Sequence, residues 1–167
     1  MAFLPVGYKL EPTKEELVGY FLRMKDSGQP LPINLYPQFI EYNIYTNHPF
    51  RILCDTLESR SVNGEVNGLE EGYFFTKPSK VSDNAKKNKS RCIKGHGTWQ
   101  EKEATTPVLD FSGRRIGNLK YYKFKPDSGS ENDSLNKDEW CMHEYSLVDK
   151  QDDYVLAHLS FRKTTSR

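Results

Sequence analysis

Residues 107–125 read Pro-Val-Leu-Asp-Phe-Ser-Gly-Arg-Arg-Ile-Gly-Asn-Leu-Lys-Tyr-Tyr-Lys-Phe-Lys. This stretch predicts a strand over 107–111, a turn over 112–115 and a second strand over 116–125, because β-branched and aromatic residues flank a Ser-Gly turn signal. Similar patterns elsewhere predict further strands at Tyr73–Phe75, Ile93–Trp99 (interrupted by Gly95 and Gly97), Trp140–Val148 and Tyr154–Phe161. The second half of the chain is therefore expected to form mainly strands.

The first half carries helix signals. Thr13 precedes Glu16 in a capping-box pattern, and Gly28 and Pro30 are expected to end the helix. Between them Leu17, Tyr20, Phe21 and Met24 recur at helical spacing, so they share one face of the helix and are expected to pack into the core. A second short helix is expected around 36–40. Helices followed by strands indicate an α+β fold rather than alternating βαβ units. Polar loops are expected at Ser128–Lys137 and Asp149–Asp153.

Composition limits the class of protein. The 167 residues suit one domain, and 10 Tyr, 9 Phe and 2 Trp make a wholly disordered chain an unsuitable description. No apolar run approaches the ~20 residues of a membrane-spanning helix, and no secretory signal is visible, so no membrane partner is expected. The three cysteines form no CxxC pair, which favours a reducing, intracellular compartment.

Charge is balanced overall but segregated along the chain. There are 24 Lys and Arg residues against 23 Asp and Glu, yet Lys77–Lys94 and Arg114–Lys125 are both strongly basic. Strand alternation places Lys123 and Lys125 on one side and Lys120 on the other. A solvated lysine run is the plain interpretation. A polyanion could instead meet one basic face on a nearly neutral molecule.

Enzyme motifs are absent from the sequence. There is no phosphate-binding loop, no nucleophile elbow and no HExxH spacing. Cys141 and His143 share a strand face, but a metal site there would need Cys54 or Cys92, and a buried, hydrogen-bonded histidine is the simpler expectation. We therefore expect no enzyme, no cofactor, no metal and no small-molecule substrate.

Four blocks of sequence resemble a known family in the correct order. Residues 4–18 resemble LPPGFRFxPTDEELV, residues 72–75 resemble WYFF, residues 140–147 resemble WVMHEYRL and residues 151–159 resemble DDWVLCRIF. These are motifs of the NAC domain, the DNA-binding module of a large group of plant transcription factors. The resemblance implies a twisted antiparallel sheet packed between helices, similar to the WRKY and GCM folds but without zinc.

The resemblance also implies an organisation for the chain. A single domain would span 1–167, with a dimerisation part at about 1–60, a DNA-binding part at about 72–125 and closing strands at about 140–162. The family dimerises through its N-terminal strand and an Arg–Glu ion pair. Here the corresponding residues are Phe3, Leu4, Pro5, Gly7, Lys9 and Glu16. Lys9 in place of Arg loses the bidentate geometry of that pair.

The family reads DNA with a WKATGxD segment whose strand edge enters the major groove. In this chain Trp99 matches, whereas Gln100, Glu101, Lys102 and Glu103 depart from the pattern. By the resemblance these residues would face bases, and phosphates would be held by Lys86, Lys87, Lys89, Arg91, Lys94, Lys120 and Lys123. Two carboxylates near a duplex would repel phosphates, although Glu can accept a hydrogen bond from cytosine N4.

The expected function is a sequence-specific, dimeric DNA-binding domain of a plant transcription factor in the nucleus, with double-stranded DNA and other NAC proteins as partners. A divergent protein-interaction module that dimerises with family members but binds DNA weakly is the alternative. A third hypothesis is recognition of a protein through the loop 126–139.

Overall fold

The computed structural model describes residues 12–29, 39–60, 71–80, 89–129, 138–148 and 154–162, without the side chains of 79, 80, 89 and 90. Its helices are α1 (Lys14–Glu16), the π-helical η1 (Leu17–Leu22), α2 (Arg23–Asp26), the 3-10 helix η2 (Ile44–Thr46), α3 (Pro49–Asp55) and α4 (Leu57–Arg60). Its strands are β1 (Phe39–Glu41), β2 (Glu71–Thr76), β3 (Ser79–Lys80), β4 (Lys89–Ser90), β5 (Cys92–Ile93), β6 (Gly97–Glu101), β7 (Thr106–Leu109), β8 (Arg115–Pro126), β9 (Glu139–Leu147) and β10 (Val155–Arg162). This order confirms the α+β prediction.

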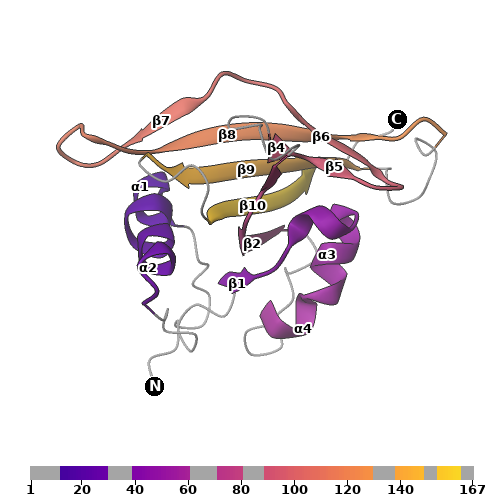
Figure 1. The fold of residues 1–167 in the computed structure, drawn as a ribbon, viewed down its shortest axis with the longest axis horizontal. Coiled ribbons are helices and arrows are strands. Elements are labelled where there is room, and N and C mark those ends of the chain that lie inside the picture. Colours follow the sequence, from indigo (N-terminus) through magenta and orange to yellow (C-terminus); the bar gives the residue numbers. More distant parts are fainter. Residues whose placement is uncertain are drawn as a thin grey trace.

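The principal sheet has eight strands in the order β1-β2-β10-β9-β8-β6-β5, and β7 also pairs with β8 (Figure 1). Only β1 is parallel to its neighbour. β6 pairs with the C-terminal half of β8 and β7 with its N-terminal half. The predicted strands are all found among these residues, and the stretch 93–99 divides at a turn into β5 and β6.

The N-terminal helix begins as predicted. The Thr13 hydroxyl accepts from the Glu16 backbone N–H at 3.2 Å, and Glu16 accepts from the Thr13 N–H at 3.1 Å. The buried side chains are Leu17, Val18, Phe21 and Leu22, whereas the expected Tyr20 is 43% exposed. The prediction for Tyr20 was wrong because the π-helical turn has more residues per turn than an α-helix, which moves the apolar stripe. Gly28, at φ 76°, ends the helix as expected.

The prediction of a short helix around 36–40 is wrong for Phe39 and Ile40, the two of these residues that the structure describes. Phe39–Glu41 form β1, which pairs with Tyr73–Phe75 of β2. Partnership with a neighbouring strand therefore outweighs the local preference of this segment. The expectations for 1–11, Pro30, Ser130–Lys137 and Asp149–Asp153 lie outside the described residues.

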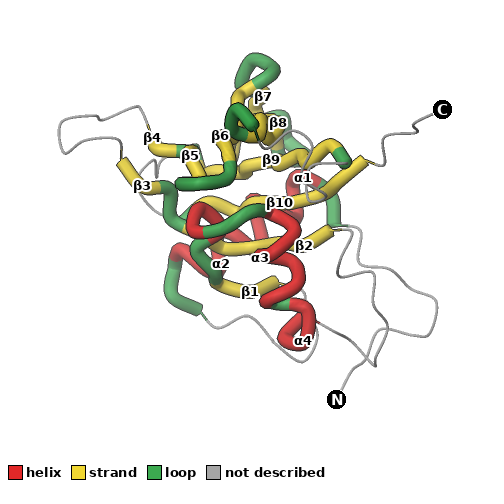
Figure 2. The backbone as a smooth tube through the Cα atoms, turned by 90° about the vertical axis from the view of Figure 1, so that its right-hand side faces the viewer, coloured by secondary structure: helices red, strands yellow, loops and turns green. Residues whose placement is uncertain are grey.

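The sheet has two buried faces, each packed against its own helices. On one face of the sheet, called the η1 face below, Leu17, Phe21 and their neighbours in η1 pack against a cluster that includes Phe75, Tyr145 and Leu156. On the other face, called the α3 face below, Ile52 and Leu53 of α3 pack against a cluster that includes Phe74, Trp99, Tyr122 and Met142. Figure 2 shows the helices on both sides of the strands. The expected architecture, a sheet packed between helices, is confirmed.

Candidate nucleic-acid interface

An exposed segment runs along the outer edge of β8. After β6 the chain continues the ladder with one bond, from the Lys102 N–H to the Tyr121 carbonyl at 3.0 Å, and rejoins the sheet at β7. Every residue from Glu101 to Pro107 is exposed, and Gln100 is half-buried. Residues 101–107, called the edge segment below, arch above β8 in Figure 1. The edge segment contains the predicted base-facing residues Glu101, Lys102 and Glu103.

Arg91 does not lie on this surface. It is 9% exposed, and its Nε and Nη2 donate to the two carboxylate oxygens of Glu144 at 3.0 and 2.8 Å. Glu144 is itself 4% exposed. The expectation that Arg91 holds phosphate is therefore corrected in this structure, because the guanidinium is buried and its Nε and Nη2 are already bound to the Glu144 carboxylate.

The surroundings of Arg91 favour its charged form. Its guanidinium carbon lies 5.4 Å from the Tyr45 ring centroid and 5.5 Å from that of Tyr122, and the Tyr45 hydroxyl donates to Glu144 at 3.1 Å. Burial lowers the pKa of Arg91, but the Glu144 carboxylate outweighs it and holds the pKa above its ordinary value. Burial, together with Glu144, also raises the pKa of Tyr45. The cluster ties the start of β5 to β9 and to η2.

Trp99 is also buried, at 3% exposure. Its ring meets that of Phe124 edge to face at 5.1 Å, within the α3-face core. The expectation that Trp99 contacts DNA is corrected accordingly. Trp99 lies on β6, which leads directly into the edge segment. The buried indole therefore anchors β6 to the core at the point where the edge segment begins.

Among the described residues, Lys120 and Lys123 do not share the expected single basic face. In the register of β8 and β9, Lys120 lies opposite Glu144 and Lys123 lies opposite Cys141. Because side chains alternate along a strand, the two lysines point to opposite faces of the sheet. Lys120 is half-buried on the α3 face, whereas Lys123 lies on the η1 face and bonds Glu139 at 2.7 Å. Lys94 is exposed in the turn between β5 and β6. Cations therefore flank the edge segment from both sides of the sheet.

The remaining expected residues are only partly placed. Lys86 and Lys87 lie outside the described residues, and Lys89 is described only as backbone of β4. Phe3, Leu4, Pro5, Gly7 and Lys9 of the expected dimer surface are likewise outside them. Glu16 is exposed, and one of its oxygens is used by the capping box.

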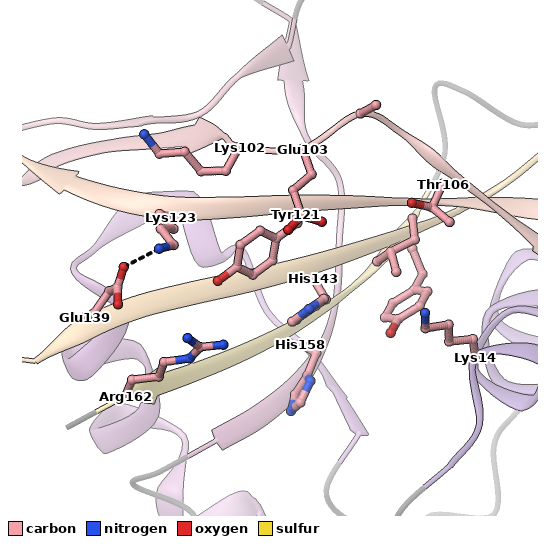
Figure 3. A pocket seen from close by; sticks show the side chains of 13 residues that line it. Lys14, Lys102, Glu103, Thr106, Tyr121, Lys123, Glu139, His143, His158 and Arg162 are labelled. Atoms are coloured by element: carbon pink, nitrogen blue, oxygen red, sulfur yellow. Dashed lines mark ion pairs between the residues drawn. The ribbon is translucent and has the colours of Figure 1, made fainter. Parts of the chain in front are cut away.

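A groove of about 840 Å³ opens on the part of the η1 face that the helices leave uncovered (Figure 3). Its lining includes the rings of Tyr121 and His143 and the basic side chains of Lys102 and Arg162. His143 is half-buried, and its Nδ1 is buried without a hydrogen-bond partner. The expectation of a buried, hydrogen-bonded histidine is thus wrong, because this part of the sheet faces the groove and not the core.

Sequence reasoning overlooked several residues of this surface. The alternation that placed Lys123 and Lys125 together also places Tyr121 with them, so this signal was present. Lys14, His158 and Arg162 join the groove from distant elements, and nothing in their local sequence indicates that they meet. Lys125 is exposed opposite Thr98 and is a further cation beside the edge segment.

Among the described residues no cluster of three or more His, Cys, Asp or Glu side chains is arranged to hold a metal ion. Within the same ranges, no helix is both long and apolar enough to cross a membrane.

A helix-flanked antiparallel sheet with an exposed, lysine-bearing edge defines the class of protein. The chain belongs to the family described as No apical meristem (NAM) protein, whose family model matches residues 5–147. It is a plant NAC family member and so belongs to a family of transcription factors rather than enzymes.

Relatives in plants match most of this chain. It is 28% identical to NAC domain-containing protein 1 of Solanum lycopersicum over 98% of its length. It is 32% identical to NAC domain-containing protein 41 and 30% identical to NAC transcription factor 56, both of Arabidopsis thaliana, over 90% and 89% of its length. The matches cover 56%, 48% and 36% of those three proteins. The chain thus spans about half the length of the curated relatives that it matches.

Proposed function

We propose that the chain is a sequence-specific DNA-binding domain that regulates transcription as a dimer in the plant nucleus. The observation that carries the proposal is the exposed edge segment with cations on both of its sides. Family membership supports the class of function. The proposal assigns no catalytic step to the chain.

An edge that enters the major groove meets a phosphate backbone on either side. The groove is about 12 Å wide and admits a two-stranded β-ribbon. Lys120 reaches from the α3 face, and Lys123 and Lys125 from the η1 face, while Lys102 lies on the edge segment itself. Lysines on both faces, which would be poorly placed for a duplex lying flat on the sheet, suit a duplex that the sheet meets edge-on.

The carboxylates of the edge segment affect sequence preference in this proposal. Glu101 and Glu103 are exposed on either side of Lys102. Each is repelled by phosphate, and each can accept from the cytosine amino group in the major groove. We infer a base preference that differs from that of a domain with the WKATGxD segment.

Selection of bound sequences from a random duplex pool, with the oligomeric state measured by light scattering, tests the proposal. Lys120→Ala is expected to weaken all duplexes alike and to lower the salt slope by about one, whereas Lys102→Met changes the preferred sequence. Arg51→Ala removes an exposed cation from α3, away from the edge segment, and is the matched control. Absence of any salt-sensitive duplex affinity in a dimeric preparation would falsify the proposal.

A second function is favoured by one observation. Glu101 and Glu103 place two negative charges on the surface that would meet DNA, which suits a chain that pairs with other NAC proteins and binds duplexes weakly. We propose that dimerisation uses Phe3, Leu4, Pro5 and Gly7, with Lys9–Glu16 fixing register. Co-purification with a family member, together with no duplex binding by the chain alone, distinguishes this function from the first.

A further inference from the structure

The groove on the η1 face lies beside the edge segment but on the broad surface of the sheet. Its lining comes from α1, from the edge segment and from three adjacent strands, β8, β9 and β10. The helix η1 packs over the η1-face core, which includes Phe75 and Leu156, and the rows of the sheet beside it line the groove. Figure 3 shows side chains from all these elements around the groove.

Aromatic rings form a continuous row across this open surface. Tyr121 and His143 are opposite each other on β8 and β9, with ring centroids 4.9 Å apart, and His143 lies 6.1 Å from His158 on β10. His158 in turn stacks on Tyr73 of β2 at 4.3 Å and 5°. Tyr121, His143 and His158 are each half-buried, so one part of each ring contacts the sheet and the other remains accessible.

The groups of this row are held in defined positions. The Tyr121 hydroxyl donates to the Cys141 sulfur at 3.2 Å, and burial together with this bond raises the pKa of Tyr121 to about 12. His158 meets Glu71 at 3.0 Å. Burial lowers the pKa of His143, which favours its neutral form. The Nδ1 of His143 is buried without a hydrogen-bond partner, so a ligand in the groove would meet the exposed part of this ring and not that nitrogen.

Positive charge predominates around the rings. The groove lining includes four basic side chains, Lys14, Lys102, Lys123 and Arg162, against the two carboxylates Glu103 and Glu139. One of these carboxylates, Glu139, is paired with Lys123 at 2.7 Å. Lys14 lies at the helix side and Arg162 at the opposite end of the groove (Figure 3). An extended anion could contact cations along its length while its apolar parts rest on the rings.

We propose that this groove binds single-stranded nucleic acid, with a base stacked on Tyr121 at the end of the aromatic row and phosphates held by Lys14, Lys102 and Arg162. Stacking platforms within a basic channel are the common means of holding unpaired strands. A duplex does not satisfy this surface, because its base faces are hidden within the helix. An acidic peptide would use the cations but would leave the rings unused. The site shares Lys102 with the edge segment proposed to meet double-stranded DNA, but its rings and its other cations lie on the broad η1 face of the sheet.

The test is a fluorescence anisotropy titration of labelled oligothymidylate and oligouridylate with the full chain at low salt. Binding in the micromolar range that weakens as salt rises is expected. Tyr121→Ala should weaken it about tenfold, because stacking on one aromatic side chain contributes that much, and Tyr121→Phe should bind like the wild type. Tyr20→Ala removes an exposed tyrosine outside the groove and is the matched control. Circular dichroism and thermal melting of each variant report whether it is folded.

Absence of oligonucleotide binding by the folded chain overturns the inference, as does equal weakening by Tyr121→Ala and Tyr20→Ala. Displacement of the oligonucleotide by thymidine monophosphate at comparable concentration would assign the groove to free nucleotides and overturn the assignment to a strand. Random duplexes titrated in parallel separate this inference from the proposed function. Binding of single-stranded oligonucleotides without binding of duplexes supports the inference about the groove and refutes the proposed function of the edge segment. Binding of duplexes without binding of single-stranded oligonucleotides supports the proposed function and refutes the inference.

Discussion

Replacing Arg91 with alanine is expected to destabilise the protein rather than simply weaken a DNA contact. The change removes both hydrogen bonds to Glu144 and leaves a carboxylate that is 4% exposed without its counter-charge. It also removes the cation that lies against the Tyr45 and Tyr122 rings. Water cannot compensate at this depth.

The magnitude follows from the burial of the pair. Breaking one partner of a buried ion pair costs about 3–5 kcal/mol, a large part of the ~5–15 kcal/mol by which a domain is stable. For a chain of this size, the cost corresponds to a fall in melting temperature of roughly 6–20 °C. Removing both charges together, as Arg91→Met with Glu144→Gln, is expected to cost less than Arg91→Ala alone, because no unpaired charge is then buried.

Urea unfolding measured by tryptophan fluorescence is a suitable assay, since the two tryptophans, Trp99 and Trp140, are both 3% exposed. Arg114→Ala, at an exposed position, is the control and should change the free energy of unfolding by less than about 0.5 kcal/mol. The reasoning is refuted if Arg91→Ala is as stable as this control but loses duplex affinity. That result would mean that Arg91 leaves Glu144 to bind phosphate.

Three further changes test other parts of the structure. In Gly117→Ala the new Cβ would lie 2.3 Å from the Ser146 carbonyl oxygen and 2.7 Å from Val18, so a loss of about 3 kcal/mol or more is expected, and an unchanged melting temperature would contradict it. Burial holds the pKa of His143 below 6.5, so the unfolded chain binds more protons at this residue than the folded chain does. The contribution of His143 to the free energy of unfolding should therefore be complete above about pH 6.5 and decline as the pH falls below it. His143→Gln should flatten this decline in urea titrations across that range. Phe111 is 99% exposed, so Phe111→Ser should leave the free energy of unfolding within about 0.5 kcal/mol of the wild type, and a larger change by urea titration would place Phe111 in a contact.

The arrangement also explains how a chain with almost no net charge could meet a polyanion. Lys120 and Lys123 are three residues apart and point to opposite faces of β8. A charge count along the sequence groups them, whereas the strand separates them by the thickness of the sheet. Cations on two faces and an exposed edge between them together form the surface that the proposed function requires.

The sequence by itself determined the strands, the capped N-terminal helix and the family. These depend on local rules: alternation and aromatic content for Trp140–Val148, and a cap three residues from its partner for Thr13 and Glu16. The same rules placed Lys123 and Lys120 on opposite sides of their strand. They failed for Tyr20, because a π-helical turn is not visible in a spacing pattern, and for Phe39, because its strand depends on a partner more than thirty residues away.

Only the tertiary structure decided which charges are available and which surface is open. Arg91 belongs to a basic run in the sequence, yet Glu144, 53 residues later, neutralises it in the interior. Likewise Lys14 and Arg162, near opposite ends of the chain, line one groove. Burial and pairing depend on contacts between residues far apart in the chain, and a single sequence contains no local signal for such contacts.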